Sequence, residues 1–276
     1  MFGSGRARAR MALGAASGLL YAFLYLPILI VIIYAFNSAT ITTWPPSSPS
    51  LHWFQVFLND PDPHDALLNS VKVALAATVV AVLLGTSAAF ALQRFRFPGK
   101  EGLNFAITLP ILLPGILTGI AMASWFNQLI AWGWLASFSL FTVALGHATF
   151  CIVLVFNNVL ARLRRTTRSL EEASMDLGAD GWQTFWHVTL PSIRGAIIAG
   201  ALLAFTLSFD EIVVTFFLIG PQNTLPLWIL SHIRLGNNFP EIDAVAVVII
   251  AISLPIVVIA QLLTREPRVA ADVPEA

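Results

Sequence analysis

The sequence predicts an all-α polytopic membrane protein with about six transmembrane helices. Of the 276 residues, 57% are hydrophobic and only 11% are charged, whereas about 25% of a typical soluble domain is charged. The apolar residues are also gathered into long stretches, as helices that cross about 30 Å of hydrocarbon require. The 15 basic and 15 acidic residues balance, so the chain lacks the basic excess that indicates nucleic-acid binding, and no nucleic-acid partner is expected.

Six stretches are long enough to span the bilayer. They are Leu13–Phe36, Asn69–Leu92, Leu103–Asn127, Leu135–Val159, Ala196–Phe217 and Ala244–Leu263. Proline is tolerated inside such spans, and Pro110, Pro114 and Pro255 are expected to mark kinks. The first stretch follows three arginines, as a signal peptide would, but its apolar run is too long for one, so we expect a retained span.

The basic residues predict the orientation. If both termini are cytoplasmic and the spans alternate, every lysine and arginine except Lys72 and Arg234 falls on the cytoplasmic side. This is the asymmetry that the positive-inside rule describes. We therefore expect a cytoplasmic tail at residues 1–12, a single transmembrane domain at 13–264 and a second cytoplasmic tail at 265–276.

One cytoplasmic connection, residues 161–195, is much longer than the others. A structureless loop of this length is uncommon, so two short helices joined by a bend are expected there. Ser169 stands three positions before Glu172, a spacing that fits a capping box. Gly178 or Gly181 supplies the bend, because glycine adopts positive φ without steric cost.

The second half of this loop is rich in large apolar side chains, namely Trp182, Phe185, Trp186 and Val188. Exposed apolar surface on a loop that faces the cytosol usually marks an interaction site. Two interpretations remain open from composition alone. The segment is either an amphipathic helix against the membrane or the bundle, or a docking helix for a cytosolic partner.

A gapped motif in this loop resembles that of a known family. Glu172-Ala173-Ser174 is followed by Gly178 and then by Leu190-Pro191, which resembles the EAA loop of ABC-importer permease subunits. Ser174 stands where the family has alanine, a change between two small residues. The resemblance covers roughly residues 69–263, which we expect to be the permease core, and it implies the MetI-like permease fold.

Three further segments resemble the spermidine/putrescine type of these permeases, although related sequences often carry asparagine where Asp243 stands. They are Gly146–Cys151, Leu203–Glu211 and Pro240–Ala244. The resemblance implies transport of polyamines or a similar small organic cation across the bacterial cytoplasmic (inner) membrane. Other permeases of this group carry different small solutes, so an opine or an amino-acid derivative is the alternative substrate.

The resemblance also implies partners. These are two cytosolic ABC ATPase subunits, a second permease subunit that is a paralogue, and an external solute-binding protein. The sequence lacks a G-x-x-x-x-G-K-[ST] phosphate loop, so ATP and Mg²⁺ are expected on the ATPases, and no cofactor or metal on this non-catalytic chain. The residues expected to couple to the ATPase are Glu172, Ala173, Ser174, Gly178, Ala179, Trp182, Phe185, Leu190 and Pro191.

Two acids lie inside the fifth predicted span, where a charge costs about 2.5–3.5 kcal/mol on insertion scales. Asp210 and Glu211, with the neighbouring Ser208 and Phe209, are expected to line a cation path. The alternatives are a polar contact with the second permease or hydration in a crevice. His147, in the fourth span, is interpreted as a hydrogen-bonded packing residue.

Two other classes of protein are alternatives that the sequence disfavours. A secondary transporter or channel subunit would also have several spans and intramembrane acids, but the EAA-like loop disfavours it. A membrane-embedded enzyme is disfavoured because neither H-E-x-x-H nor G-x-S-x-G occurs and the two acids lack an evident nucleophile or metal partner. The sequence therefore predicts a transport subunit.

Overall fold

The computed structural model describes residues 3–236 and 239–264, which fold into helices with no β-strand among them. The chain packs as two compact units, one formed by residues 1–63 with 231–276 and the other by residues 64–230. The predicted tail at 265–276, with Arg265 and Arg268, lies outside the described residues. At the other end, α1 (Gly3–Ala35) begins inside the predicted tail at 1–12.

Among the described residues, four helical stretches are long and apolar enough to cross a membrane. They are Arg10–Ala35, Pro61–Arg94, Leu140–Arg165 and Gly181–Phe209. A bent pair of helices would make a fifth if the pair is one span. The sixth predicted stretch falls within α12 (Phe239–Thr264). Several long apolar helices thus confirm the membrane class, while the number six and the side of the termini stay predictions.

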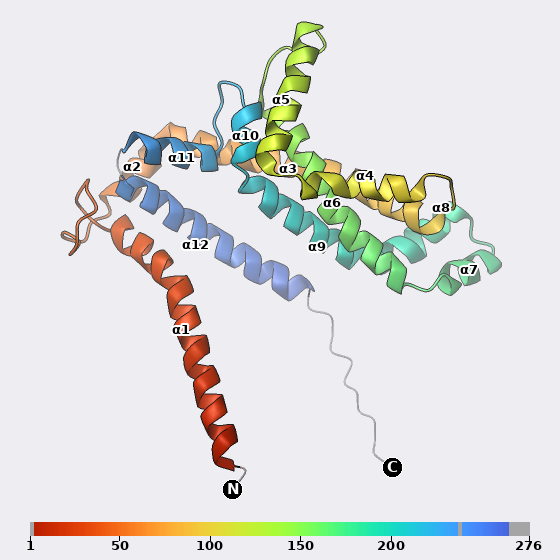
Figure 1. Cartoon of the computed structure of the whole chain (residues 1–276), viewed down its shortest axis with the longest axis horizontal. Helices are drawn as coiled ribbons and strands as arrows, with labels where there is room; N and C mark the ends of the chain where they lie inside the picture. The colour runs from red at the N-terminus through yellow and green to blue at the C-terminus, as the bar shows by residue number, and fades with distance from the viewer. Residues whose placement is uncertain (1–2, 237–238, 265–276) are drawn as a thin grey trace. The chain divides into compact units, whose positions relative to one another are not determined.

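In the first unit, the C-terminal end of α1 contacts α12, from which α1 then diverges, and α2 (His52–Asn59) packs against α12 (Figure 1). Trp53 of α2 is buried in one cluster with Ala35 and Ala244. Most of α1 keeps its large apolar side chains exposed, as a helix that meets lipid would.

In the second unit, α6 (Leu140–Arg165) is the central helix, and it packs most extensively on α9 (Leu190–Phe209). Two glycines allow neighbouring helices to approach it closely. A Cβ on Gly200 of α9 would lie 2.9 Å from Cα of Val155, and a Cβ on Gly85 of α3 (Pro61–Arg94) 2.9 Å from the carbonyl oxygen of Ile152. Small residues at such contacts let membrane helices pack backbone to backbone.

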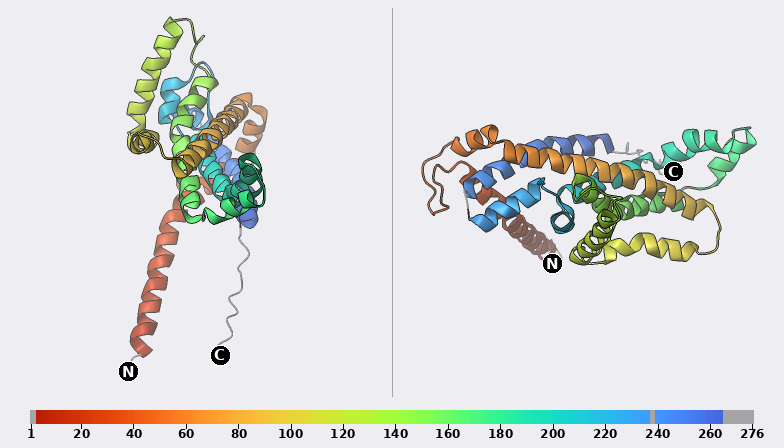
Figure 2. Two further views of the ribbon diagram at one scale, coloured as in Figure 1. Left: turned by 90° about the vertical axis from the view of Figure 1, so that its right-hand side faces the viewer. Right: turned by 90° about the horizontal axis from the view of Figure 1, so that it is seen from above.

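The third predicted span, Leu103–Asn127, is not one continuous helix. It is divided between α4 (Lys100–Leu112) and α5 (Gly115–Ala131), which meet at 108°, as Figures 1 and 2 show. The break lies at Leu113, which is extended with ψ 138°, just before Pro114. Proline disfavours the helical conformation for the preceding residue, so the expected kink is a full break.

The fifth predicted span, Ala196–Phe217, is also interrupted. Helix α9 ends at Phe209, and a separate short helix, α10 (Val213–Leu218), follows and packs against α5 and α6. The interruption coincides with Asp210 and Glu211, whose polar side chains stabilise backbone groups at helix ends better than in an apolar helix interior. The last helix that begins in this unit is α11 (Leu225–Leu235).

Candidate functional site: the coupling loop and a helix break

The loop at 161–195 contains the expected bend. Helix α7 (Ser169–Asp176) is followed by Leu177 as its C-cap and then by Gly178, whose φ is +92°. The N–H of Ala179 donates to the carbonyl of Ser174 at 3.1 Å, and the N–H of Gly178 donates to that of Met175 at 2.9 Å. This pair of bonds is a Schellman motif, which requires a left-handed residue at its centre. Of the two glycines proposed for the bend, Gly178 is therefore the one that makes it.

The second helix, α8 (Gly181–Thr184), begins at a capping box. The Asp180 side chain accepts from the N–H of Gln183 at 2.7 Å, and the Gln183 side chain accepts from the N–H of Asp180 at 3.1 Å. The capping box expected at Ser169 and Glu172 is wrong, because α7 starts without a side-chain cap. After α8 the helix continues through a π-helical turn, η1 (Phe185–Thr189), directly into α9.

The outer face of this loop exposes large apolar side chains. Leu177 is 90% exposed and Trp182 is 70% exposed. Phe185 is instead half-buried, and its ring lies edge-on to Phe90 of α3 with ring centroids 5.6 Å apart. The exposed ring of Trp182 stacks on that of Phe185, with ring centroids 6.3 Å apart. The loop thus presents an apolar surface that Phe185 supports from below through its contact with Phe90.

The remaining predicted coupling residues divide by exposure. Glu172, Ala173 and Pro191 are exposed, whereas Ser174, Ala179 and Leu190 are partly buried. Ser174 and Thr184 bring α7 and α8 together, with their hydroxyl oxygens 3.2 Å apart. Leu190 and Pro191 open α9 directly after the π-helical turn η1.

Sequence reasoning missed the buried acid of this loop, Glu171. Its side chain is 9% exposed, and one oxygen accepts from Arg94 Nη2 at 2.6 Å and from Thr189 Oγ1 at 3.0 Å. Glu172, which matches the family motif, is 61% exposed and pairs only loosely with Arg168, at 3.7 Å. No local pattern singled it out, because the apolar residues of α7, namely Leu170, Ala173 and Met175, are exposed.

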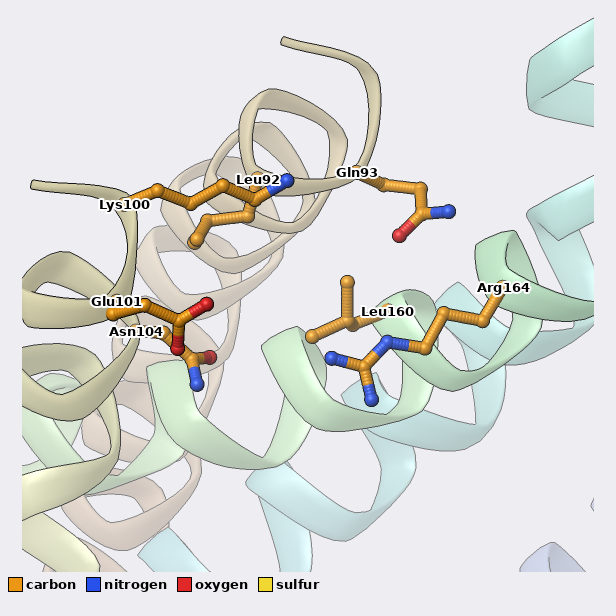
Figure 3. A pocket seen from close by; sticks show the side chains of 7 residues that line it. All are labelled: Leu92, Gln93, Lys100, Glu101, Asn104, Leu160 and Arg164. Carbon is orange, nitrogen blue, oxygen red and sulfur yellow. The ribbon is translucent and has the colours of Figure 1, made fainter. Parts of the chain in front are cut away.

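A small polar cavity lies close to the end of α3 (Figure 3). Its volume is about 80 Å³, and its lining comes from α3, α4 and α6: Leu92, Gln93, Lys100, Glu101, Asn104, Leu160 and Arg164. Pockets that hold small molecules measure about 300–1,000 Å³. This cavity is therefore too small for a ligand site of that kind.

The four residues predicted to line a path gather where α9 gives way to α10, but they differ in surroundings. Ser208 is buried and Phe209 is partly buried. Glu211 Oε1 accepts from the N–H of Val214 at 3.0 Å and so caps α10. Asp210 is exposed, and its carboxylate has no hydrogen bond or ion pair within the part of the chain that the structure describes. Of the two acids, Asp210 is thus the exposed one, and Glu211 is held at the start of α10.

His147 of α6 fixes both sides of this break. It is 1% exposed, and its Nδ1 and Nε2 lie 2.8 Å from Ser208 Oγ and 2.9 Å from Thr215 Oγ1. Thr215 gives its hydroxyl hydrogen to the carbonyl of Glu211 at 2.7 Å. Nε2 must therefore be the donor to Thr215, and Nδ1 accepts from Ser208. The packing role expected for His147 is confirmed, and it joins α9 to α10.

Within the described residues, no group of three or more His, Cys, Asp or Glu side chains is arranged to hold a metal ion. Cys151, one turn beyond His147, is buried and its thiol donates to the carbonyl of Ala204 at 3.3 Å.

Comparison with known proteins identifies the class. The family described as "Binding-protein-dependent transport system inner membrane component" matches residues 70–266, and the chain belongs to this family. It is the permease subunit of a binding-protein-dependent ABC importer, as the EAA-like loop predicted. The alternative of a secondary transporter or channel subunit is therefore set aside.

Two curated relatives are putrescine or spermidine permeases. The chain is 43% identical over 234 residues to the putrescine transport system permease protein PotI of Escherichia coli (strain K12), covering 83% of this chain and 82% of PotI. It is 33% identical over 263 residues to the spermidine/putrescine transport system permease protein PotC of the same strain, covering 93% and 95%. The polyamine-type resemblance in the sequence is thereby confirmed.

A solved structure shares the fold. A chain of the bacterial alginate ABC transporter, in complex with a periplasmic protein that carries an alginate pentasaccharide, superposes with a TM-score of 0.73 over 94% of this chain and 96% of that one. The two sequences are only 15% identical. This likeness confirms the MetI-like permease fold, and it carries no information on the solute.

Proposed function

We propose that this chain is a permease subunit of an importer for putrescine, spermidine or a similar small organic cation in the bacterial inner membrane. The names of the relatives support a polyamine, and the exposed carboxylate of Asp210 at a break in an apolar helix is the observation that carries the proposal. A charged side chain within a membrane span has a free-energy cost, and attraction of a cationic solute is a reason to keep it. An opine or an amino-acid derivative is the alternative solute.

The loop from α7 to α8 is the docking element for a cytosolic ATPase. Its support is the apolar outer face, where Leu177 and Trp182 are exposed although the chain around them is held by a Schellman motif and a capping box. Exposed apolar surface on an ordered element is typical of an interface. In this arrangement both termini are cytoplasmic, six spans cross the membrane, and Glu172, Gly178 and Trp182 face the ATPase.

The importer contains further chains. Two ATPase subunits bind and hydrolyse ATP with Mg²⁺, a second and paralogous permease subunit completes the path, and an external binding protein delivers the solute. Nucleotide shifts the inward–outward equilibrium only by its different affinity for the two states. A rigid loop seated on the ATPase is what conveys that difference to α6 and α9, the helices on either side of it.

Within the path, Asp210 meets the solute. Ser208 is hydrogen-bonded to His147, and Glu211 caps the start of α10, so these two side chains hold the shape of the break. Phe209 stacks on Phe205, with ring centroids 6.0 Å apart. An ammonium group about 4 Å from a carboxylate gains about 1 kcal/mol even in water, and several times more where the effective dielectric constant is lower.

The experiment compares Asp210→Asn with Asp62→Asn, an exposed acid at the start of α3. The complex is co-expressed with its neighbouring genes, and ATP-dependent uptake of putrescine and spermidine is measured with the loaded binding protein. Because one carboxylate is lost, we expect half-saturation for the amines to rise at least about fivefold in Asp210→Asn. Normal uptake by Asp210→Asn would reject this role, and stimulation by an uncharged or anionic solute would indicate the alternative substrate.

A further inference from the structure

A buried ion pair connects the docking loop to a helix that is distant in sequence. Arg94 is the last residue of α3, and Glu171 lies in the first turn of α7. Arg94 Nη2 and Glu171 Oε1 are 2.6 Å apart, and the two side chains are only 8% and 9% exposed. The same carboxylate oxygen accepts from Thr189 in η1 at 3.0 Å. One carboxylate thus joins α3, α7 and the start of the α9 span.

The burial of this pair makes it a specific contact. Surface ion pairs contribute little because both partners remain solvated, but a buried charge that loses its partner is strongly disfavoured. Glu171 therefore prefers the one position in which Arg94 and Thr189 both reach it. Glu172, one residue later, turns outward and keeps most of its hydration, so it has no comparable preference.

The pair also adds a connection that the polypeptide alone does not make. Along the chain, α7 is joined to α6 through residues 166–168 and to α8 through residues 177–180. Arg94 of α3, which contacts Glu171, lies 77 residues before it in the sequence. The aromatic contact of Phe90 with Phe185 lies one turn earlier on α3 and supports the same junction.

We propose that Glu171 is a positioning residue for coupling, which ties the docking loop to the end of α3 through Arg94. When the ATPase displaces the loop, α3 then moves with it, in addition to α6 and α9. This inference rests on the proposed function, in which the loop docks on the ATPase. Glu171, and not only the motif residue Glu172, thereby determines how much ATPase motion reaches the membrane helices.

The test compares Glu171→Gln with the matched control Glu101→Gln, at an exposed acid of α4 outside the docking loop, in the full complex. Two spin labels, on Arg96→Cys and Ser169→Cys, report the distance between the end of α3 and α7. Both positions are exposed, and the single natural cysteine, Cys151, is replaced by serine. The distance distribution is recorded with and without nucleotide, and uptake per ATP hydrolysed is measured in unlabelled complexes.

In Glu171→Gln we expect a broader distance distribution and an uptake per ATP that falls about threefold to tenfold, within the range of coupling effects seen for residues between sites. Glu101→Gln should change neither quantity. Arg94→Lys retains a cation at the carboxylate and should keep both near the wild-type values. Thr189→Val removes only the hydroxyl and should change both in the same direction as Glu171→Gln, but less.

The proposal is overturned if Glu171→Gln matches Glu101→Gln, or if the distances broaden while uptake per ATP is unchanged, since the pair would then be only structural. If Glu171→Gln does not assemble, Thr189→Val and Arg94→Lys decide by the same two measurements. The distance measurement needs no solute. A wild-type complex that polyamines do not stimulate would therefore reject the proposed substrate. It would not bear on the contact between Glu171 and Arg94, which the distance measurement tests.

Discussion

Replacing His147 by phenylalanine tests how the helix break is held. Phenylalanine fills a similar volume in the core but lacks both ring nitrogens, so the bonds at 2.8 Å to Ser208 and at 2.9 Å to Thr215 are lost. Thr215 keeps its own donation to the carbonyl of Glu211. Ser208, which is 3% exposed, loses the acceptor for its hydroxyl hydrogen.

The expected loss of stability follows from these two sites. A buried donor without an acceptor costs about 1–3 kcal/mol. The bond to Thr215 adds about 0.6–1.7 kcal/mol, the range measured for hydrogen bonds between membrane helices. The sum is roughly 2–5 kcal/mol, which corresponds to a fall in Tm of about 5–15 °C for a domain of this size.

The assay is thermal unfolding of the purified complex in lipid nanodiscs, with Cys151→Ala as the matched control. Cys151 is buried one turn further along α6 and makes a single weak bond, at 3.3 Å, so its loss should lower the Tm much less. Because Asp210 lies at the end of the helix that Ser208 anchors, half-saturation for the amine should rise in His147→Phe as well. A Tm and a half-saturation equal to those of Cys151→Ala would refute the role given to His147.

Two further predictions concern glycines that a larger side chain would disturb, one at a left-handed turn and one at a close helix contact. Gly178→Ala places a side chain at φ +92° and costs about 1–2 kcal/mol in the loop, so less ATPase should co-purify. Gly181→Ala, which has open space and ordinary φ, should leave the yield unchanged, and equal yields would contradict the Schellman bend. Gly85→Val forces atoms onto the backbone of α6 and should lower the Tm by several degrees, about 1–3 kcal/mol, whereas Gly102→Ala, in open space, should not.

The parts predicted best from sequence are those with a local physical cause. The apolar runs predict the long helices, because a helix that crosses the hydrocarbon core of a membrane needs about 20 consecutive apolar residues. Gly178 was one of two candidates for the bend, since a left-handed residue is readable from glycine alone. The family was recognised from the gapped motif at Glu172, Gly178 and Pro191, whose residues lie within one loop.

The parts that sequence could not supply depend on tertiary contacts. Pro114 predicted a kink, whereas the chain turns through 108° between α4 and α5, and α5 packs against α10, which is distant in sequence. The roles of Asp210 and Glu211 separate because Glu211 finds the N–H of Val214. Glu171 and Glu172 look alike in sequence, and the partner that distinguishes them, Arg94, is 77 residues away.

Uptake of radiolabelled putrescine into proteoliposomes tests the polyamine importer most directly. The liposomes contain this chain with its partner permease and ATPases, and the binding protein is added outside, with ATP enclosed. We expect uptake that requires the loaded binding protein and ATP and that unlabelled spermidine or putrescine competes away. Uptake of putrescine no faster than in liposomes without the complex, while another solute is accumulated, would contradict the polyamine assignment.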